Sequence, residues 1–117
     1  MEFSSILVNK AISLAEIAAI AESGYGIMVK AVVDIKQEIM VIGSELHVDE
    51  ESVLLDLGSK QEDLWGINIF HAQPRTEWIQ FDSMINLRPS QNNRSRSVED
   101  PQIQQRIRGI IDKLISK

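Results

Sequence analysis

Two β-forming segments lie so close together in this sequence that they restrict how the chain can fold. In residues 28–35 apolar side chains alternate with polar ones, Lys30 and Asp34 among them, as in a strand with one buried face. A second β-rich run, residues 39–43, follows after a gap at residues 36–38. This spacing predicts an antiparallel hairpin, although its turn lacks the usual glycine.

Capping residues indicate three helices. Ser13 precedes an apolar pattern of helical spacing, and Glu16 completes the capping-box motif. Asp49 stands where it can cap a second helix, and the acids after it suit the positive end of a helix. In the last third, Asp100 is a cap and Pro101 occupies the first helical position, where its missing N–H costs nothing.

A second hairpin is indicated between the last two helices. Residues 64–70 and 78–87 are β-rich and are separated by a turn at residues 72–75. The order is therefore (β)αββαββα, an α+β fold with an antiparallel or mixed sheet of two hairpins, four to five strands in all, and helices on one face. With 44% apolar residues and no internal repeat or linker, residues 1–117 are expected to form a single domain.

Composition excludes several classes of protein. There is no cysteine, which rules out a disulfide framework and thiolate chemistry, and the net charge of −5 argues against a nucleic-acid footprint over the whole surface. No apolar run approaches the about 20 residues of a membrane span, and no export signal is visible. We therefore expect a soluble, cytoplasmic protein without a membrane partner.

No motif for a cofactor or a metal is present. The chain lacks the glycine patterns of phosphate and dinucleotide loops. Glu45, His47 and Asp49 would share one side of an extended backbone, but this trio is non-specific and Asp49 is already assigned to a helix cap. We expect neither a cofactor nor a metal site.

The segment 78–88 is the most informative for function. As one strand it would place Gln80, Asp82, Asn86 and Arg88 on the face away from the core, where Asn68 joins them across the hairpin. The alternative is an ordinary solvated strand face. A break in the strand at residues 82–83 would also scramble this row.

The 88–96 loop continues that strand and contains three arginines and no acid. Guanidinium groups donate in pairs to phosphate and carboxylate, and Asn92 tolerates a left-handed backbone, so the loop suits an anion. The alternative is a polar connection whose arginines bind acids of the same chain. The candidate binding residues of the strand face and loop are Asn68, Gln80, Asp82, Asn86, Arg88, Ser90, Asn92, Arg94 and Arg96.

Four segments, residues 31–34, 43–47, 58–68 and 81–90, resemble a small prokaryotic domain-of-unknown-function family, the one numbered 5674. The likeness runs from about residue 28 onward. It implies a self-contained domain and supplies no mechanism. In that family's pattern a glycine stands at the position of Asn92, and asparagine is the residue best able to replace it at positive φ.

Three hypotheses follow, and the sequence leaves open whether the protein is an enzyme. The first is a binding or regulatory module for an anionic partner, either nucleic acid or a phosphate-bearing ligand, through the 88–96 loop. The second is a small hydrolase or transferase using Asp82, Asn86, Arg88 and His47. The third is a homo-oligomeric protein-interaction module without a ligand.

Overall fold

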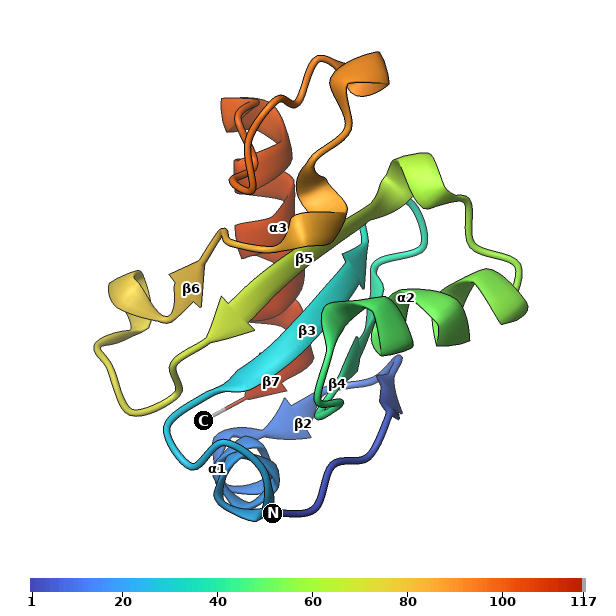
Figure 1. The fold of residues 1–117 in the computed structure, drawn as a ribbon. Coiled ribbons are helices and arrows are strands. Elements are labelled where there is room, and N and C mark those ends of the chain that lie inside the picture. The colour runs from blue at the N-terminus through green and yellow to red at the C-terminus, as the bar shows by residue number, and fades with distance from the viewer. Residues whose placement is uncertain (117) are drawn as a thin grey trace.

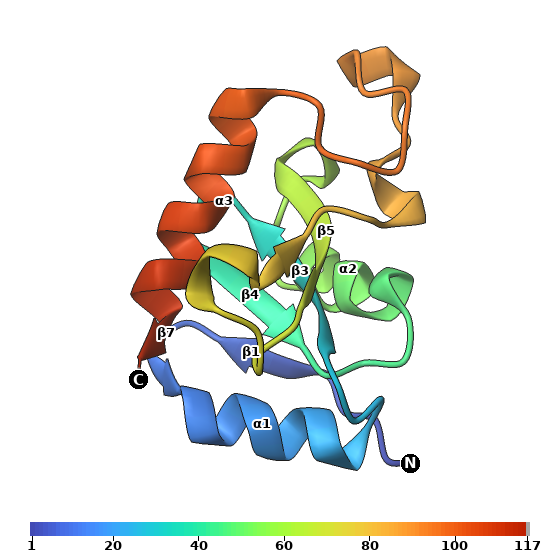
Figure 2. The same cartoon turned by 90° about the vertical axis from the view of Figure 1, so that its left-hand side faces the viewer.

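The computed structural model describes residues 1–116 and shows an α+β fold with a central sheet (Figures 1 and 2). Its main elements are β1 (Ile6–Val8), β2 (Ile12–Ser13), α1 (Leu14–Ser23), β3 (Val29–Asp34), β4 (Ile39–Ile42), α2 (His47–Asp56), β5 (Leu64–Ile69), β6 (Ile79–Gln80), α3 (Pro101–Leu114) and β7 (Ile115–Ser116). Short 3-10 helices connect some of them: η1 (Gln61–Asp63), η2 (Arg75–Glu77), η3 (Met84–Asn86) and η4 (Pro89–Gln91).

The five-stranded sheet has the order β1-β4-β3-β5-β6, and every neighbouring pair is antiparallel. Val33 of β3 lies opposite Met40 on one side and Trp65 on the other. Both predicted hairpins, β3–β4 and β5–β6, are therefore confirmed. A separate parallel pair, β2 with β7, joins the two ends of the chain through Ile12 and Ile115.

Helices cover both faces of the sheet, so the prediction of helices on one face is wrong. Val33 points into the larger core with Ile17 of α1 and Ile107 of α3, whereas Val32 packs with Leu54 of α2. Figure 2 shows α3 and α2 on opposite sides of the sheet. Val32 is as fully buried as Val33. Val32 lies on the same side of the strand as Lys30 and Asp34, and its apolar side chain at that position is the sequence feature that indicates a second buried face.

Two of the three predicted helix caps are confirmed. The Ser13 hydroxyl accepts from the backbone N–H of Glu16 at 3.1 Å, and the Asp100 carboxylate accepts from Gln102 N–H at 2.9 Å. The second helix begins at His47, so Asp49 lies in its first turn and does not cap it. Leu46 occupies the cap position and offers no side-chain acceptor.

The glycine-free turn between β3 and β4 is held by Asp34. One carboxylate oxygen accepts from the N–H groups of Lys36 (2.9 Å) and Gln37 (3.0 Å), and the other accepts from the Ser59 hydroxyl at 2.7 Å. Burial opposes ionisation of Asp34, but these hydrogen bonds outweigh it and lower its pKa. Glu38 adopts φ 58°, the backbone conformation that a glycine would otherwise supply.

The predicted long strand over residues 78–87 is wrong, because β6 ends at Gln80 and the chain then turns into η3. Beyond β6, the Asn86 side chain replaces the missing strand by pairing with both backbone groups of Gly66 in β5. The bare Gly66 makes this close approach feasible, since a Cβ there would lie 2.6 Å from Ser83 Cβ.

Candidate functional site

A row of polar side chains crosses three strands on the face that α2 covers only in part. Lys30 of β3 lies opposite Asn68 of β5, which lies opposite Gln80 of β6. The Asn68 amide donates to Gln80 Oε1 at 2.8 Å and to the Asp82 carbonyl at 3.3 Å. Asn68 and Gln80 therefore lie side by side, as the strand pairing predicted, and the backbone of Asp82 reaches them although it lies beyond the end of β6.

A hollow of about 160 Å³ lies next to this row. We call this hollow the polar hollow. It is bounded by β3, by the start of α2 and by the segment around η3. Its lining residues are Lys30, Leu46, His47, Val48, Ser83, Met84, Ile85 and Arg96. Leu46, Val48 and Met84 are half or more exposed, so the rim is apolar although cations line the hollow.

The charge of the polar hollow comes from Lys30 and Arg96. Burial lowers the pKa of His47, so this imidazole is neutral at neutral pH, and its Nε2 donates to the Ile67 carbonyl at 2.8 Å. Burial raises the pKa of Glu50 to about 10, so this carboxyl keeps its proton and does not neutralise Lys30. His47 and Glu50 are therefore both uncharged at neutral pH, and the positive charges of Lys30 and Arg96 are not offset by Glu50.

Arg96 is held by a single exposed ion pair. Its Nε lies 2.7 Å from Asp82 Oδ1, and the two side chains are 55% and 42% exposed. Such a pair contributes only about 0–1 kcal/mol in water. The terminal amino groups of Arg96 donate to no other group within residues 1–116, so they are available to an anion.

Arg88 does not face solvent, and its predicted place in an accessible row is wrong. It is 9% exposed, lies 4.2 Å over the Trp65 ring, and donates to the carbonyls of Gln61 and Leu64, the latter at 2.7 Å. Burial lowers the pKa of Arg88, while the charge of Glu51 opposes that shift. The guanidinium fork ties the 88–96 loop to β5 and does not reach a ligand.

Asn86 is also buried, and its predicted exposure is wrong. Its Oδ1 accepts from Gly66 N at 2.8 Å, and its Nδ2 donates to the carbonyls of Gly66 (2.9 Å) and Arg96 (3.0 Å). All of the amide's contacts go to backbone groups, so Asn86 is part of the scaffold that places Arg96.

The rest of the 88–96 loop is ordered by Asn93, which is not among the candidate binding residues. Its Nδ2 donates to the carbonyls of Asn86 and Ser97, both at 2.7 Å. Asn92 adopts φ 60°, so the predicted left-handed backbone is present. Ser90 and Arg94 are exposed but do not line the polar hollow.

Comparison with known proteins shows which family this chain belongs to. A family model described as "Protein of unknown function (DUF5674)" matches residues 6–114. The chain belongs to the DUF5674 family. The match begins where β1 begins and ends where α3 ends, so the whole sheet and all three helices are part of the DUF5674 domain. Neither the curated proteins nor the solved structures contain a match to this chain.

The residues named for hydrolase or transferase chemistry do not meet in this DUF5674 domain. Asp82 forms an ion pair with Arg96. Asn86 and Arg88 form hydrogen bonds with backbone groups of β5, at Gly66 and Leu64 respectively. His47 lines the polar hollow, but in helix α2, so it does not form an extended trio with Glu45 and Asp49. Within residues 1–116 no cluster of three or more acids and histidines is placed to hold a metal.

No helix among residues 1–116 is both long enough and apolar enough to span a membrane. The longest, α3, has 14 residues and buries its apolar side on the sheet. Its stripe of isoleucines is therefore accounted for by the core.

Proposed function

We propose that this DUF5674 domain is a cytoplasmic, non-catalytic binding module for a phosphate-bearing ligand, which it holds at the polar hollow. One observation carries the proposal: Lys30 and Arg96, from different elements, line the same small hollow in a chain whose net charge is −5. Like charges brought together without equal counter-charge favour an anion. The absence of cysteine fits the reducing compartment.

The surroundings of the hollow suit phosphate in particular. A guanidinium fork presents two parallel donors, which match the oxygens of a phosphate group. The start of α2 also borders the hollow, and no side chain caps it. The N–H groups of a helix start carry partial positive charge, which favours an anion there.

A small ligand is favoured over a nucleic acid. Burial of Arg88 leaves two exposed arginines in the 88–96 loop, Arg94 and Arg96, and of these only Arg96 lines the hollow. Nucleic-acid affinity depends on neutralising many phosphates along a track. A hollow of about 160 Å³ instead suits one or two phosphate groups.

Isothermal titration with pyrophosphate and with ATP at low salt tests the proposal. We expect Arg96→Gln and Lys30→Gln each to weaken binding at least tenfold, about 1.4 kcal/mol. Lys113→Gln is the matched control, since it removes one exposed positive charge that pairs with Glu38 away from the hollow. Equal affinity in all variants would exclude the polar hollow as the binding site. Tighter binding of a single-stranded oligonucleotide than of pyrophosphate and ATP would show that the ligand is a nucleic acid and not a small molecule.

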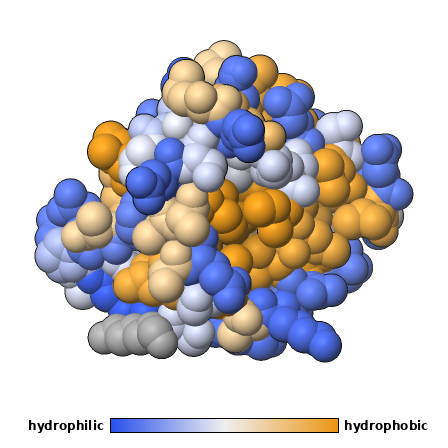
Figure 3. Space-filling model, turned by 90° about the horizontal axis from the view of Figure 1, so that it is seen from below, coloured by the Kyte–Doolittle hydropathy of each residue, from blue (hydrophilic) through white to orange (hydrophobic). Residues whose placement is uncertain are grey.

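Self-association is a second candidate function, favoured by an apolar surface. Hydrophobic residues gather on the face seen from below in Figure 3, the side on which α1 lies. In α1 the side chains of Ala15 and Ala19 are exposed, and β1 is an edge strand whose Leu7 is 40% exposed. Edge strands with apolar side chains are prone to pair with another chain.

Light scattering at increasing protein concentration tests this candidate. A dimer that dissociates in Leu7→Lys would support pairing through β1, because a lysine on an edge strand opposes strand addition. A monomer at every concentration would rule it out.

A further inference from the structure

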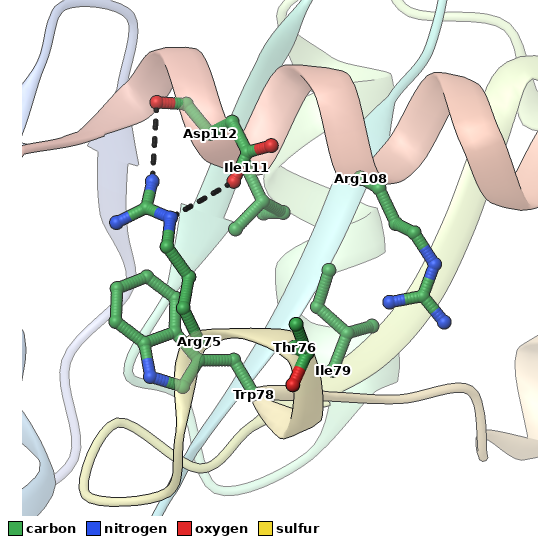
Figure 4. A pocket seen from close by; sticks show the side chains of 7 residues that line it. All are labelled: Arg75, Thr76, Trp78, Ile79, Arg108, Ile111 and Asp112. Atoms are coloured by element: carbon green, nitrogen blue, oxygen red, sulfur yellow. Dashed lines mark hydrogen bonds and ion pairs between the residues drawn. The ribbon is translucent and has the colours of Figure 1, made fainter.

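A second cleft lies apart from the polar hollow, at the β6 edge of the sheet. Its volume is about 470 Å³, and η2 and α3 form its two sides (Figure 4). We call it the edge cleft. Its main lining residues are Arg75, Trp78, Ile79, Arg108, Ile111 and Asp112. None of them lines the polar hollow.

The middle of the edge cleft is apolar and rigid. Figure 4 shows Ile79 and Ile111 between the Arg75 side and the Arg108 side. Trp78 is only 3% exposed, and its indole N–H donates to the Gln73 carbonyl at 2.8 Å, which fixes the ring. Buried aromatic and branched side chains that stay in place favour a flat apolar group.

One end of the cleft is closed by Arg75, whose Nε and one of whose terminal amino groups donate within the protein. Its Nε lies 3.1 Å from Asp112 Oδ1, and one terminal amino group donates to the Ile115 carbonyl at 3.2 Å. The guanidinium also lies 4.4 Å over the Trp78 ring. Arg75 therefore fastens η2 to the end of α3 and forms a wall.

The other end carries a guanidinium whose charge is not compensated. Arg108 and Asp112 are four residues apart on α3, the spacing at which a helix usually forms an ion pair, but Arg75 takes Asp112 instead. Arg108 lies 5.1 Å over the Phe81 ring and forms no hydrogen bond or ion pair with residues 1–116. The aromatic contact orients the guanidinium without neutralising it.

We propose that the edge cleft binds a small anion with a flat apolar body, of the class of aryl carboxylates and aryl phosphates. The apolar body lies against Ile79, over a floor to which the buried Trp78 and Ile111 contribute, and the anionic group receives hydrogen bonds from Arg108. The volume of the cleft is within the roughly 300–1,000 Å³ of small-molecule sites. This site is independent of the proposed function, since it shares no residue with the polar hollow.

The test is a titration of the ¹⁵N-labelled protein followed by NMR, with benzoate and phenyl phosphate as probes and uncharged benzamide as control. The chain has two tryptophans, so the indole N–H of Trp78 reports on the cleft and that of Trp65, in the core, is an internal reference. We expect a saturable shift at Trp78 with both anions and at least tenfold weaker binding of benzamide.

Variants decide whether Arg108 is responsible. Arg108→Gln should weaken binding of both anions at least tenfold, and Arg108→Lys, which keeps the charge, should bind them more tightly than Arg108→Gln. Arg96→Gln should leave this binding unchanged, which separates it from the polar hollow. The proposal is overturned if no saturable shift occurs at Trp78, if benzamide binds as well as benzoate, or if Arg108→Gln binds like the unmodified protein while its spectrum shows a folded domain.

Discussion

Replacing Asn86 by alanine should destabilise the domain more than any substitution in the exposed part of the 88–96 loop. Asn86 is fully buried, and its amide provides the hydrogen-bond partners of Gly66 N and Gly66 O. Its third partner, the Arg96 carbonyl, keeps a hydrogen bond from Ser83 N at 3.0 Å. Asn86→Ala therefore leaves two buried backbone groups unpaired, and at about 1–3 kcal/mol each the expected loss is about 2–6 kcal/mol.

Urea unfolding followed by far-UV circular dichroism measures this loss. Gln91→Ala is the matched control, because it also removes an amide that donates to a backbone carbonyl, at 3.1 Å from Glu62 O, but on an exposed side chain. We expect the control to change the free energy of unfolding by no more than about 0.5 kcal/mol. Equal stability of the two variants would show that the Asn86 side chain does not take the place of a strand beside Gly66.

Three further predictions concern buried positions. Gly66→Ala should cost about 1–3 kcal/mol in urea unfolding, since the new methyl group would clash with Ser83; a neutral effect would mean that η3 moves freely. Because burial raises the pKa of Glu50 from 4.5 to about 10, the contribution of Glu50 to stability should be complete below about pH 4.5 and fall as pH rises from there to about 10. Glu50→Gln should flatten that fall, and an unchanged pH profile would show that Glu50 ionises freely. The pKa of Asp34 is lowered, so its contribution is present above its ordinary pKa of about 4 and is lost as pH falls below it. Thermal unfolding of Asp34→Ala should therefore show lower stability at neutral pH and a weaker acid dependence than the unmodified chain; parallel curves would refute this.

Local signals predicted the helices and hairpins because the interactions behind them are local. Ser13 and Asp100 bond to N–H groups two or three residues away, and such contacts are visible in a sequence pattern. The break after β6 is different, since Asn86 pairs with Gly66 across 20 residues. Alternation predicts a strand, but it carries no information on whether a side chain will take the place of a backbone neighbour.

The second face of the sheet was hidden for a related reason. Asp34 counted as a polar position, yet it is 1% exposed and bonds within the turn and to Ser59. A buried carboxylate with several donors is satisfied, so it does not mark a solvent-facing side. Lys30 lines the polar hollow, but the sequence shows it only as a single cation in a mostly apolar strand, which does not predict a role in binding.

Arginines of similar sequence context have different roles in this fold, and the difference lies in which backbone groups need a donor. Arg88 lies between η3 and η4, where its guanidinium satisfies the carbonyls of Gln61 and Leu64 at the start of β5. Buried polar groups take partners before any ligand can, because leaving them unpaired costs more than an exposed contact contributes. Binding is therefore expected only where donors remain after the fold is satisfied, and Arg96 and Arg108 meet this condition within residues 1–116. Their two sites can be tested separately, because neither residue lines the hollow of the other.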